Sequence, residues 1–238
     1  WVYFARPDST IEDVSVYKAR RRFGKEMAAR WVAAGAPMPD VVIPVPDSAR
    51  AAAQTLAEDL GVPYREGFVK NRYVGRTFLM PGQQERRRSV RHKLNPVRLE
   101  FEGKRVLIVD DSIVRGNTSR AIVQMARAAG ATAVYFASYS APLVHPCIYG
   151  IDMSTRSEVI ARDLPTEEIR QRIGADYLLY QEVEGMVRAV QEGNPSLGKF
   201  CKACFDGRYP TEGVTPEVLA EWERDRTKPD VPAAQPAC

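Results

Sequence analysis

The chain has 238 residues, of which 45% are hydrophobic and 27% charged, and its formal net charge is +4. This length suits one large domain, or one domain with an appendage, and the composition is typical of a soluble globular protein. We find no apolar run near the roughly 18 residues of a membrane span and no signal-peptide pattern, so we expect no membrane association. The modest positive charge favours anionic small molecules over nucleic acid as ligands. Because the sequence begins at Trp1 rather than Met, we expect a processed product or a fragment.

The first predicted elements are a strand over residues 1–7 and a helix over residues 14–34. Aromatic and β-branched residues favour the strand, and apolar residues at helical spacing favour the helix. Gly35-Ala36-Pro37 is expected to end the helix. Three consecutive arginines, Arg20 to Arg22, fall within it, and we expect them on its solvent-facing side.

A second unit combines a buried-type strand at residues 41–48 with a helix at residues 49–60. Pro46-Asp47-Ser48 lies at the turn between them. The Ser48 hydroxyl is a candidate contact for phosphate or Mg²⁺, and an N-cap role on the following helix is compatible with this. If the strands are parallel neighbours, this turn lies beside the acidic loop described below.

A third strand, residues 62–69, leads into a long polar and basic connection at residues 70–96. A connection of this length inside a compact domain is typical of a lid or of disorder. Its cations suit a flap that closes over an anionic substrate and excludes water. A nucleic-acid-binding arm and a merely solvated loop are the alternatives. The candidate lid contacts are Lys70, Arg72, Tyr73 and Arg76.

The most informative stretch runs from Val106 to Ser119. Four aliphatic residues lead into Asp110 and Asp111, then into a polar turn and a helical segment. A short apolar run bounded by turn signals predicts a parallel strand buried on both faces. The turn offers backbone N–H groups, hydroxyls and a helix N-terminus to a phosphate. The two carboxylates suit sugar hydroxyls or a divalent metal bound to a neighbouring diphosphate.

Phosphate, ribose and metal-bound diphosphate at one strand end together describe phosphoribosyl diphosphate (PRPP). The spacing is neither that of a Walker loop nor that of a Rossmann glycine motif. An ordinary strand-to-helix turn is the alternative. The candidate PRPP-binding residues are Asp47, Ser48, Asp110, Asp111, Ser112, Arg115, Gly116, Asn117, Thr118 and Ser119. The candidate Mg²⁺ ligands among them are Ser48, Asp110 and Asp111.

The rest of the chain predicts a strand at residues 132–140, a helix capped near Pro165, a strand at residues 176–180 and a helix at residues 183–191. A short helix is expected at residues 217–224. Residues 228–238 are rich in Pro and Ala, and we expect them to be disordered.

These motifs resemble those of the amidophosphoribosyltransferase family of type I phosphoribosyltransferases. The likeness extends to about Tyr209 and rests on five stretches, with residues 146–153 also fitting. The five are Tyr3 to Ser9, Pro46 to Ser48, Lys70 to Phe78, Val90 to Asn95 and Val109 to Ser119.

The resemblance implies an α/β fold whose mostly parallel central sheet is flanked by helices. It divides the chain into a phosphoribosyltransferase domain at residues 1–199, a cysteine-containing segment at 200–210 and a tail at 211–238. Within the domain it implies a hood from residues 1–35 and 145–199 and a flexible lid at 70–96.

The resemblance also implies that a cytoplasmic enzyme displaces diphosphate from PRPP with ammonia, giving 5-phosphoribosylamine, the first committed step of purine synthesis. The implied catalytic residues are Asp110, Asp111, Lys70, Arg72, Tyr73 and Arg76. Such enzymes carry an N-terminal glutaminase domain, which this sequence does not show, so we expect only the ammonia-dependent half of the reaction. Inhibition by purine nucleotides and a homo-oligomer are implied as well.

Four cysteines are present, and Cys201 and Cys204 form a C-x2-C pair. With Cys147 they give three soft ligands, whereas disulfides are not expected in the cytosol. The resemblance implies a [4Fe–4S] cluster on Cys147, Cys201 and Cys204, with a fourth cysteine upstream of Trp1. Cys238, in the Pro-rich tail, is a poor substitute. Three cysteines without metal, or a structural zinc, are the alternatives.

Two other functions fit the same motifs. A nucleobase phosphoribosyltransferase would consume a purine or pyrimidine with PRPP. A PRPP-sensing transcriptional regulator would bind PRPP without turnover and would need a DNA-binding module, which the sequence does not reveal.

Overall fold

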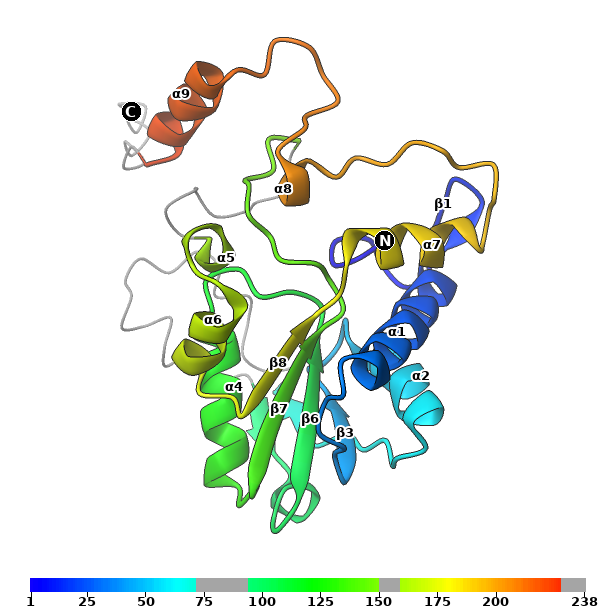
Figure 1. Ribbon diagram of the computed structural model, residues 1–238, viewed down its shortest axis with the longest axis vertical. Helices are drawn as coiled ribbons and strands as arrows, with labels where there is room; N and C mark the ends of the chain where they lie inside the picture. The colour runs from blue at the N-terminus through cyan, green and yellow to red at the C-terminus, as the bar shows by residue number, and fades with distance from the viewer. Residues whose placement is uncertain (72–93, 150–158, 228–238) are drawn as a thin grey trace, which may run out of the picture.

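A four-stranded parallel sheet forms the centre of the computed structural model, which describes residues 1–71, 94–149 and 159–227 (Figure 1). The strand order is β3-β6-β7-β8, and a parallel bridge between Val42 and Tyr64 adds a fifth position outside β3. The strands are β3 (Val41–Pro44), β6 (Arg105–Asp110), β7 (Ala133–Ser138) and β8 (Tyr177–Tyr180). This sheet confirms the predicted α/β fold.

Helices cover both faces of the sheet, as the unbroken apolar runs of the strands predict. In β6, Leu107 and Val109 join one buried cluster, whereas Val106 and Ile108 join the other. The first cluster lies under α1 (Val16–Ala33), α2 (Arg50–Leu60) and α7 (Val183–Gln191). The second lies under α4 (Asn117–Ala128) and α6 (Thr166–Ile173).

The strand order places a topological switch point between β3 and β6. From β3 the chain moves outward to Tyr64 and later returns to β6 on the opposite side of β3. The connections that follow β3 and β6 therefore leave in opposite directions. In open α/β sheets, ligands bind at such a switch point, beyond the carboxyl ends of the strands.

The N-terminal segment differs from the prediction. Residues 1–7 form no strand, and a short hairpin of β1 (Thr10–Ile11) and β2 (Val14–Ser15) precedes α1 instead. Arg20, expected in solvent, is only 2% exposed, because its guanidinium donates hydrogen bonds to backbone carbonyls of the segment. Side chains, not a neighbouring strand, thus satisfy part of this backbone.

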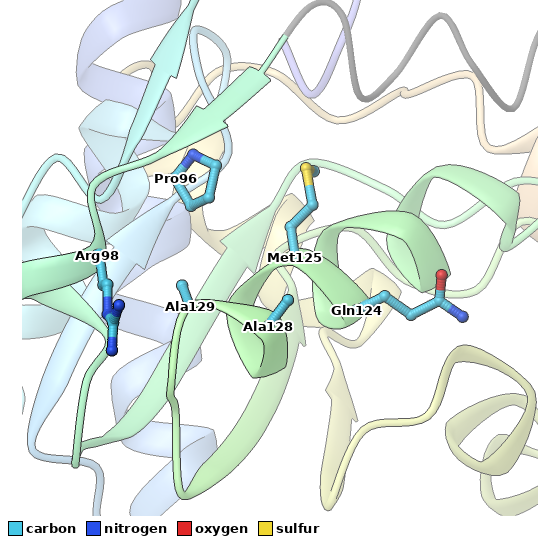
Figure 2. A pocket seen from close by; sticks show the side chains of 6 residues that line it. All are labelled: Pro96, Arg98, Gln124, Met125, Ala128 and Ala129. Atoms are coloured by element: carbon cyan, nitrogen blue, oxygen red, sulfur yellow. The ribbon is translucent and has the colours of Figure 1, made fainter.

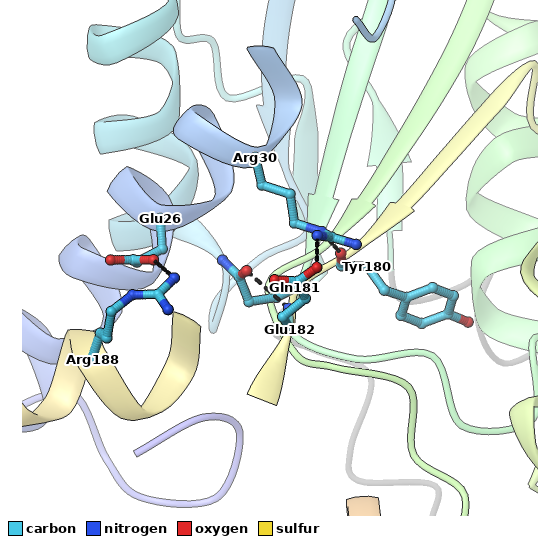
Figure 3. A network of polar contacts seen from close by, with 6 residues as sticks. All are labelled: Glu26, Arg30, Tyr180, Gln181, Glu182 and Arg188. Carbon is cyan, nitrogen blue, oxygen red and sulfur yellow. Dashed lines mark hydrogen bonds and ion pairs between the residues drawn. The ribbon is translucent and has the colours of Figure 1, made fainter. Parts of the chain in front are cut away.

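Polar contacts fasten the C-terminal half of α1 to β8 and α7 (Figure 3). Arg30 Nε donates to the carbonyl of Tyr180 at 2.7 Å, and its guanidinium also pairs with Glu182. Arg188 of α7 lies 2.6 Å from Glu26 of α1. Since a pair that bridges two helices restricts both, α7 is held against the layer that α1 forms.

The residues 145–199 expected in a hood include β8 and α7, and residues 1–35 include α1. These elements instead belong to the layers of the central domain. The reason is their apolar pattern, which buries them against the sheet. A covering role for the other residues in these ranges stays a prediction.

The expected strand at residues 62–69 is reduced to the bridge at Tyr64 and to β4 (Phe68–Lys70). β4 pairs antiparallel with β5 (Leu94–Pro96), so this ribbon joins the two ends of the predicted lid. Arg72, Tyr73, Arg76 and residues 228–238 lie outside the described residues.

The remaining elements are η2 (Arg98–Glu100), α5 (Ile160–Asp163), α8 (Ala203–Asp206) and α9 (Pro216–Thr227). Within the described ranges, no helix combines the length and apolar character that crossing a bilayer requires.

Candidate active site

Two loops meet at the carboxyl edge of the sheet, one after β3 and one after β6. Val45 N donates to the carbonyl of Val109 at 2.8 Å, which continues the pairing of the two strands beyond β3. Residues 46–48 therefore leave the sheet beside Asp110 and Asp111, and Ser48 hydrogen-bonds Asp111. The Pro46–Asp47 peptide bond is cis. The structure thus brings together the two loops that the sequence singles out.

The acid pair occupies the last position of β6 and the residue after it. Asp110 is 7% exposed, and its Oδ1 accepts a 2.8 Å hydrogen bond from the Asp111 N–H. Asp111 Oδ1 accepts a 2.6 Å hydrogen bond from Ser112 Oγ. These bonds fix both carboxylates at the rim of the sheet.

Burial raises the pKa of both carboxyls, and the negative charge of Asp111 raises the pKa of Asp110 further. Hydrogen bonds from Ser112 and Ser48 and the positive charge of Arg20 act in the opposite direction on Asp111. A divalent cation or a set of hydroxyl donors would stabilise the ionised pair. Because Mg²⁺ prefers carboxylate and hydroxyl oxygens, the donor set of Ser48, Asp110 and Asp111 fits this ion.

The turn after the acid pair leads into the N-terminus of α4. Gly116 adopts φ +74°, and a Cβ added there would come within 2.9 Å of Ile160 Cδ1. Asn117 and Thr118 are exposed, whereas Ser119 is only 2% exposed. The free amides of the first turn of this 12-residue helix, with its dipole, favour a bound phosphate.

Of these residues, Asn117 and Thr118 lie where a ligand has access, together with Arg115, which is also exposed. The burial of Ser119 leaves its backbone amide, rather than its hydroxyl, as the group best placed for an anion. Each of these binding roles stays a prediction.

Lys70 lies at the same edge through its contact with Asp47. Lys70 Nζ is 2.8 Å from Asp47 Oδ2, and Arg50 Nη1 is 3.2 Å from Asp47 Oδ1. All three side chains are about half exposed, so each pair is worth little on its own. They nevertheless join the start of the predicted lid to the loop after β3.

Two residues of the site were not predicted, Arg20 and Tyr139. Both are buried, and the pKa of Tyr139 is raised first by burial and then by the charge of Asp111. A signal for Arg20 was present, since its spacing of four from Val16 and three from Phe23 places it on the buried stripe of α1. Tyr139 directly follows β7, which pairs with β6, the strand that ends at Asp110.

Two of the described cysteines, Cys147 and Cys204, lie at a small apolar cluster that also includes Leu143 and Val159. Cys147 is buried in it, Cys204 packs against it, and Cys201 is exposed. The pKa of Cys204 is raised to about 11, chiefly by burial; a hydrogen bond from Tyr3 lowers it, and the nearby thiols of Cys147 and Cys201 raise it.

Among the described residues, no group of three or more His, Cys, Asp or Glu side chains is arranged to hold a metal ion. Cys147, Cys201 and Cys204 are nevertheless near enough for the first two to act on the pKa of the third. The predicted iron–sulfur cluster stays a prediction, and Cys238 lies outside the described residues.

A pocket that lies apart from this site is shown in Figure 2. It has a volume of about 340 Å³ and lies between the segment after β5 and the C-terminal half of α4. Its lining residues are Pro96, Arg98, Gln124, Met125, Ala128 and Ala129. Mostly apolar and at the other end of α4, it lacks the convergent polar groups of the acid-pair loops.

Comparison with known families agrees with this geometry. Residues 21–142, just over half of the chain, match the phosphoribosyl transferase domain. The match includes both site loops, and the chain therefore belongs to the phosphoribosyltransferase domain family.

The full-length relatives that it resembles are more specific. It is 50% identical over 226 residues to the amidophosphoribosyltransferase of Pseudomonas aeruginosa, covering 94% of this chain and 45% of that protein. With the Escherichia coli amidophosphoribosyltransferase it shares 51% identity over 218 residues, 90% of this chain and 43% of that protein. The chain thus spans about half the length of the curated relatives it matches.

Two solved structures resemble it over the same portion. The glutamine PRPP amidotransferase of Bacillus subtilis, complexed with ADP and GMP, aligns with a TM-score of 0.77 and 50% identity, over 89% of this chain and 46% of that one. A structure described as the allosteric regulatory enzyme of purine biosynthesis aligns with a TM-score of 0.79 and 48% identity, over 93% of this chain and 47% of that one.

Proposed function

We propose that this chain catalyses the displacement of diphosphate from PRPP by ammonia, giving 5-phosphoribosylamine, the first committed step of purine synthesis. The observation that carries the proposal is the acid pair at the carboxyl end of β6, which faces the Ser48 turn and adjoins the N-terminus of α4. Relatives of about 50% identity that are named amidophosphoribosyltransferase support the choice of reaction.

The proposal assigns each part of PRPP to groups of matching chemistry. The 5-phosphate binds the backbone amides and hydroxyls of residues 115–119. Asp110 and Asp111 accept hydrogen bonds from the ribose 2- and 3-hydroxyls. Asp47 and Ser48 line the place of the diphosphate, and Lys70 contributes positive charge there.

No side chain has to act as a nucleophile in this reaction. The chain's residues hold the anomeric carbon, exclude water and stabilise developing charge. Such positioning is worth on the order of 7–11 kcal/mol in well-oriented cases. Ser48, Asp110 and Asp111 would hold Mg²⁺, which would supply positive charge to the leaving diphosphate. Arg72, Tyr73 and Arg76 complete the proposed lid.

The proposal extends to partners that a longer protein would supply. Ammonia would come from a glutaminase part, and purine nucleotides would inhibit, in keeping with the ADP and GMP of the Bacillus subtilis structure. A homo-oligomer and a cytoplasmic location belong to the same proposal.

A [4Fe–4S] cluster on Cys147, Cys201 and Cys204, with an upstream fourth cysteine, is also proposed. Absorption near 400 nm in the full-length protein, lost in a Cys204→Ser variant, tests it. Zinc content without that absorption would favour the structural alternative.

The test of the main proposal is diphosphate release from PRPP by this 238-residue chain, with ammonium, with glutamine and with purine or pyrimidine bases. We expect release with ammonium and Mg²⁺ only. Release that requires a base would assign a nucleobase phosphoribosyltransferase. PRPP binding without release under any condition would favour a sensor.

A further inference from the structure

The hydroxyl of Tyr139 lies between two segments that are far apart in the sequence. It is 2.9 Å from the carbonyl oxygen of Val2 and 3.3 Å from that of Ser48, and the side chain is fully buried. Val2 belongs to the N-terminal segment, and Ser48 belongs to the loop after β3. A hydroxyl has one proton to donate, so the two carbonyls share a single donor.

The position of this hydroxyl is fixed from two sides. The Tyr139 ring stacks on Phe23 of α1, with centroids 5.8 Å apart and an interplanar angle of 17°. Its backbone N–H donates to the carbonyl of Asp110 at 3.1 Å, which links it to the acid pair. Because the ring and the backbone of Tyr139 are both held, its hydroxyl stays in place. A movement of the N-terminal segment or of the loop after β3 would therefore alter a hydrogen bond to this hydroxyl.

Arg20 makes a second link to the same segment. Its Nε donates to the carbonyl of Trp1 at 3.1 Å, and its Nη2 donates to the carbonyl of Ala5 at 2.8 Å. A buried guanidinium bonded to neutral carbonyls is stable only with negative charge nearby. Its positive charge acts on Asp111, so the cation joins the segment to the acid pair electrostatically.

We propose that Tyr139 and Arg20 are positioning residues that couple the N-terminal segment, residues 1–5, to the PRPP site. When the segment is docked, the Ser48 loop and the acid pair are held in the arrangement that binds PRPP. By reciprocity, PRPP binding stabilises the docked segment. This inference rests on the proposed function, since it assigns these residues to the same site.

The first experiment compares Tyr139→Phe with Tyr135→Phe in the full chain. Tyr135 lies on β7, the strand that Tyr139 directly follows, and packs in the same cluster, and within the described residues its hydroxyl has no hydrogen-bond partner. Either change removes one hydroxyl and keeps the ring. We expect Tyr139→Phe to raise the KM for PRPP about fivefold, or about 1 kcal/mol, with kcat little changed. Tyr135→Phe should leave both constants unchanged.

A readout besides activity is hydrogen exchange of residues 1–5 with and without PRPP. In the unaltered chain and in Tyr135→Phe, PRPP should slow exchange in this segment. In Tyr139→Phe the slowing should be lost or strongly reduced. A purely structural role of Tyr139 would instead speed exchange equally with and without PRPP.

A double-mutant cycle with Arg20→Lys tests whether the two residues act through one segment. If they do, the combined variant raises the KM for PRPP by clearly less than the product of the two single changes. Thermal unfolding of each variant checks that it folds, and if Arg20→Lys does not, the exchange measurement on Tyr139→Phe decides.

The outcomes separate this inference from the proposed function. If the unaltered chain neither binds PRPP nor releases diphosphate, the proposed function fails. If the unaltered chain is active and Tyr139→Phe matches Tyr135→Phe in KM and in exchange, the coupling is refuted. Multiplicative changes in the cycle would refute the common route through residues 1–5.

Discussion

Replacing Asp111 with asparagine tests the acid pair because it removes one negative charge and keeps the shape of the side chain. The remaining carbonyl oxygen still accepts the 2.6 Å hydrogen bond from Ser112 Oγ. What disappears is the charge offered to ribose hydroxyls or to Mg²⁺. A loss of activity without a loss of stability therefore reports on the substrate-facing role of Asp111.

The expected loss of ammonia-dependent turnover is at least tenfold, or about 1.4 kcal/mol. Hydrogen bonds to charged groups contribute about 1.5–3 kcal/mol, so a loss of ten- to hundredfold is consistent with the proposed contacts. The free energy of unfolding of Asp111→Asn, in contrast, should not fall. Burial raises the folded-state pKa of Asp110 and Asp111, so the fold becomes less stable as pH rises from about 3.8 through those raised values. Removing one charge should leave the free energy of unfolding at pH 7 equal or higher.

The assay is diphosphate release from PRPP with saturating ammonium and Mg²⁺, together with urea unfolding at pH 7 in the absence of metal. Asp59→Asn is the matched control, because Asp59 is an exposed carboxylate on α2 with no partner among the described residues. Near-normal turnover of Asp111→Asn would refute the role of the acid pair. A loss of activity that is matched by a loss of stability would point to misfolding and would contradict the reasoning as well.

Three further predictions concern other parts of the chain. Gly116→Ala should lower the free energy of unfolding by about 1–2 kcal/mol because of the positive φ, and by more because its methyl group would contact Ile160. Gly103→Ala, at φ +71° with open space around it, should lower the free energy of unfolding by the first amount only. Equal losses of the two variants in urea unfolding would contradict this. The pKa of Cys204 is raised to about 11, chiefly by burial, so about one thousandth of this thiol is thiolate at pH 8. Iodoacetamide should therefore modify exposed Cys201 before Cys204, and peptide mass spectrometry measures the order. Equal rates would contradict the buried environment of Cys204. Hydrogen bonds, chiefly from Arg170, lower the pKa of Glu167 to about 2, so the stabilisation by this carboxylate is present above pH 4.5 and declines toward pH 2. The difference in free energy of unfolding between the unaltered chain and Glu167→Gln should therefore shrink across that pH range. A constant difference would contradict this role of Glu167.

Much of the central domain could be predicted from local patterns. Apolar runs of four or five residues identified β3, β6, β7 and β8, because strands covered by helices on both faces carry few polar side chains. The helix at residues 183–191 has the predicted bounds, since its ends are marked by polar residues and its stripe is regular. Parallel pairing then placed the two site loops at one edge.

The N-terminal segment could not be predicted in the same way. Its aromatic residues favour a strand, but its carbonyls are satisfied by Arg20 and Tyr139, which lie 15 or more positions away in the sequence. Such a solution depends on tertiary contacts that no local pattern contains. Arg20 is an exception in part, because its spacing from Val16 and Phe23 already placed it on the buried stripe. Its charge led to the wrong prediction of exposure, since a buried arginine needs partners that the sequence alone does not reveal.

The acid pair is also where the chain departs from what stability alone would favour. Two adjacent carboxylates at the end of a buried strand raise each other's energy, yet residues 106–109 of β6 are fully buried in two apolar clusters. Those clusters hold β6 in register with β3 and β7, so the strand ends at Asp110 whether or not the pair is neutralised. The unfavourable charge is therefore confined to a rigid edge, where a cation or a sugar can relieve it. The buried core is stable enough to tolerate the repulsion between the two carboxylates. A ligand that relieves this repulsion gains binding free energy from it.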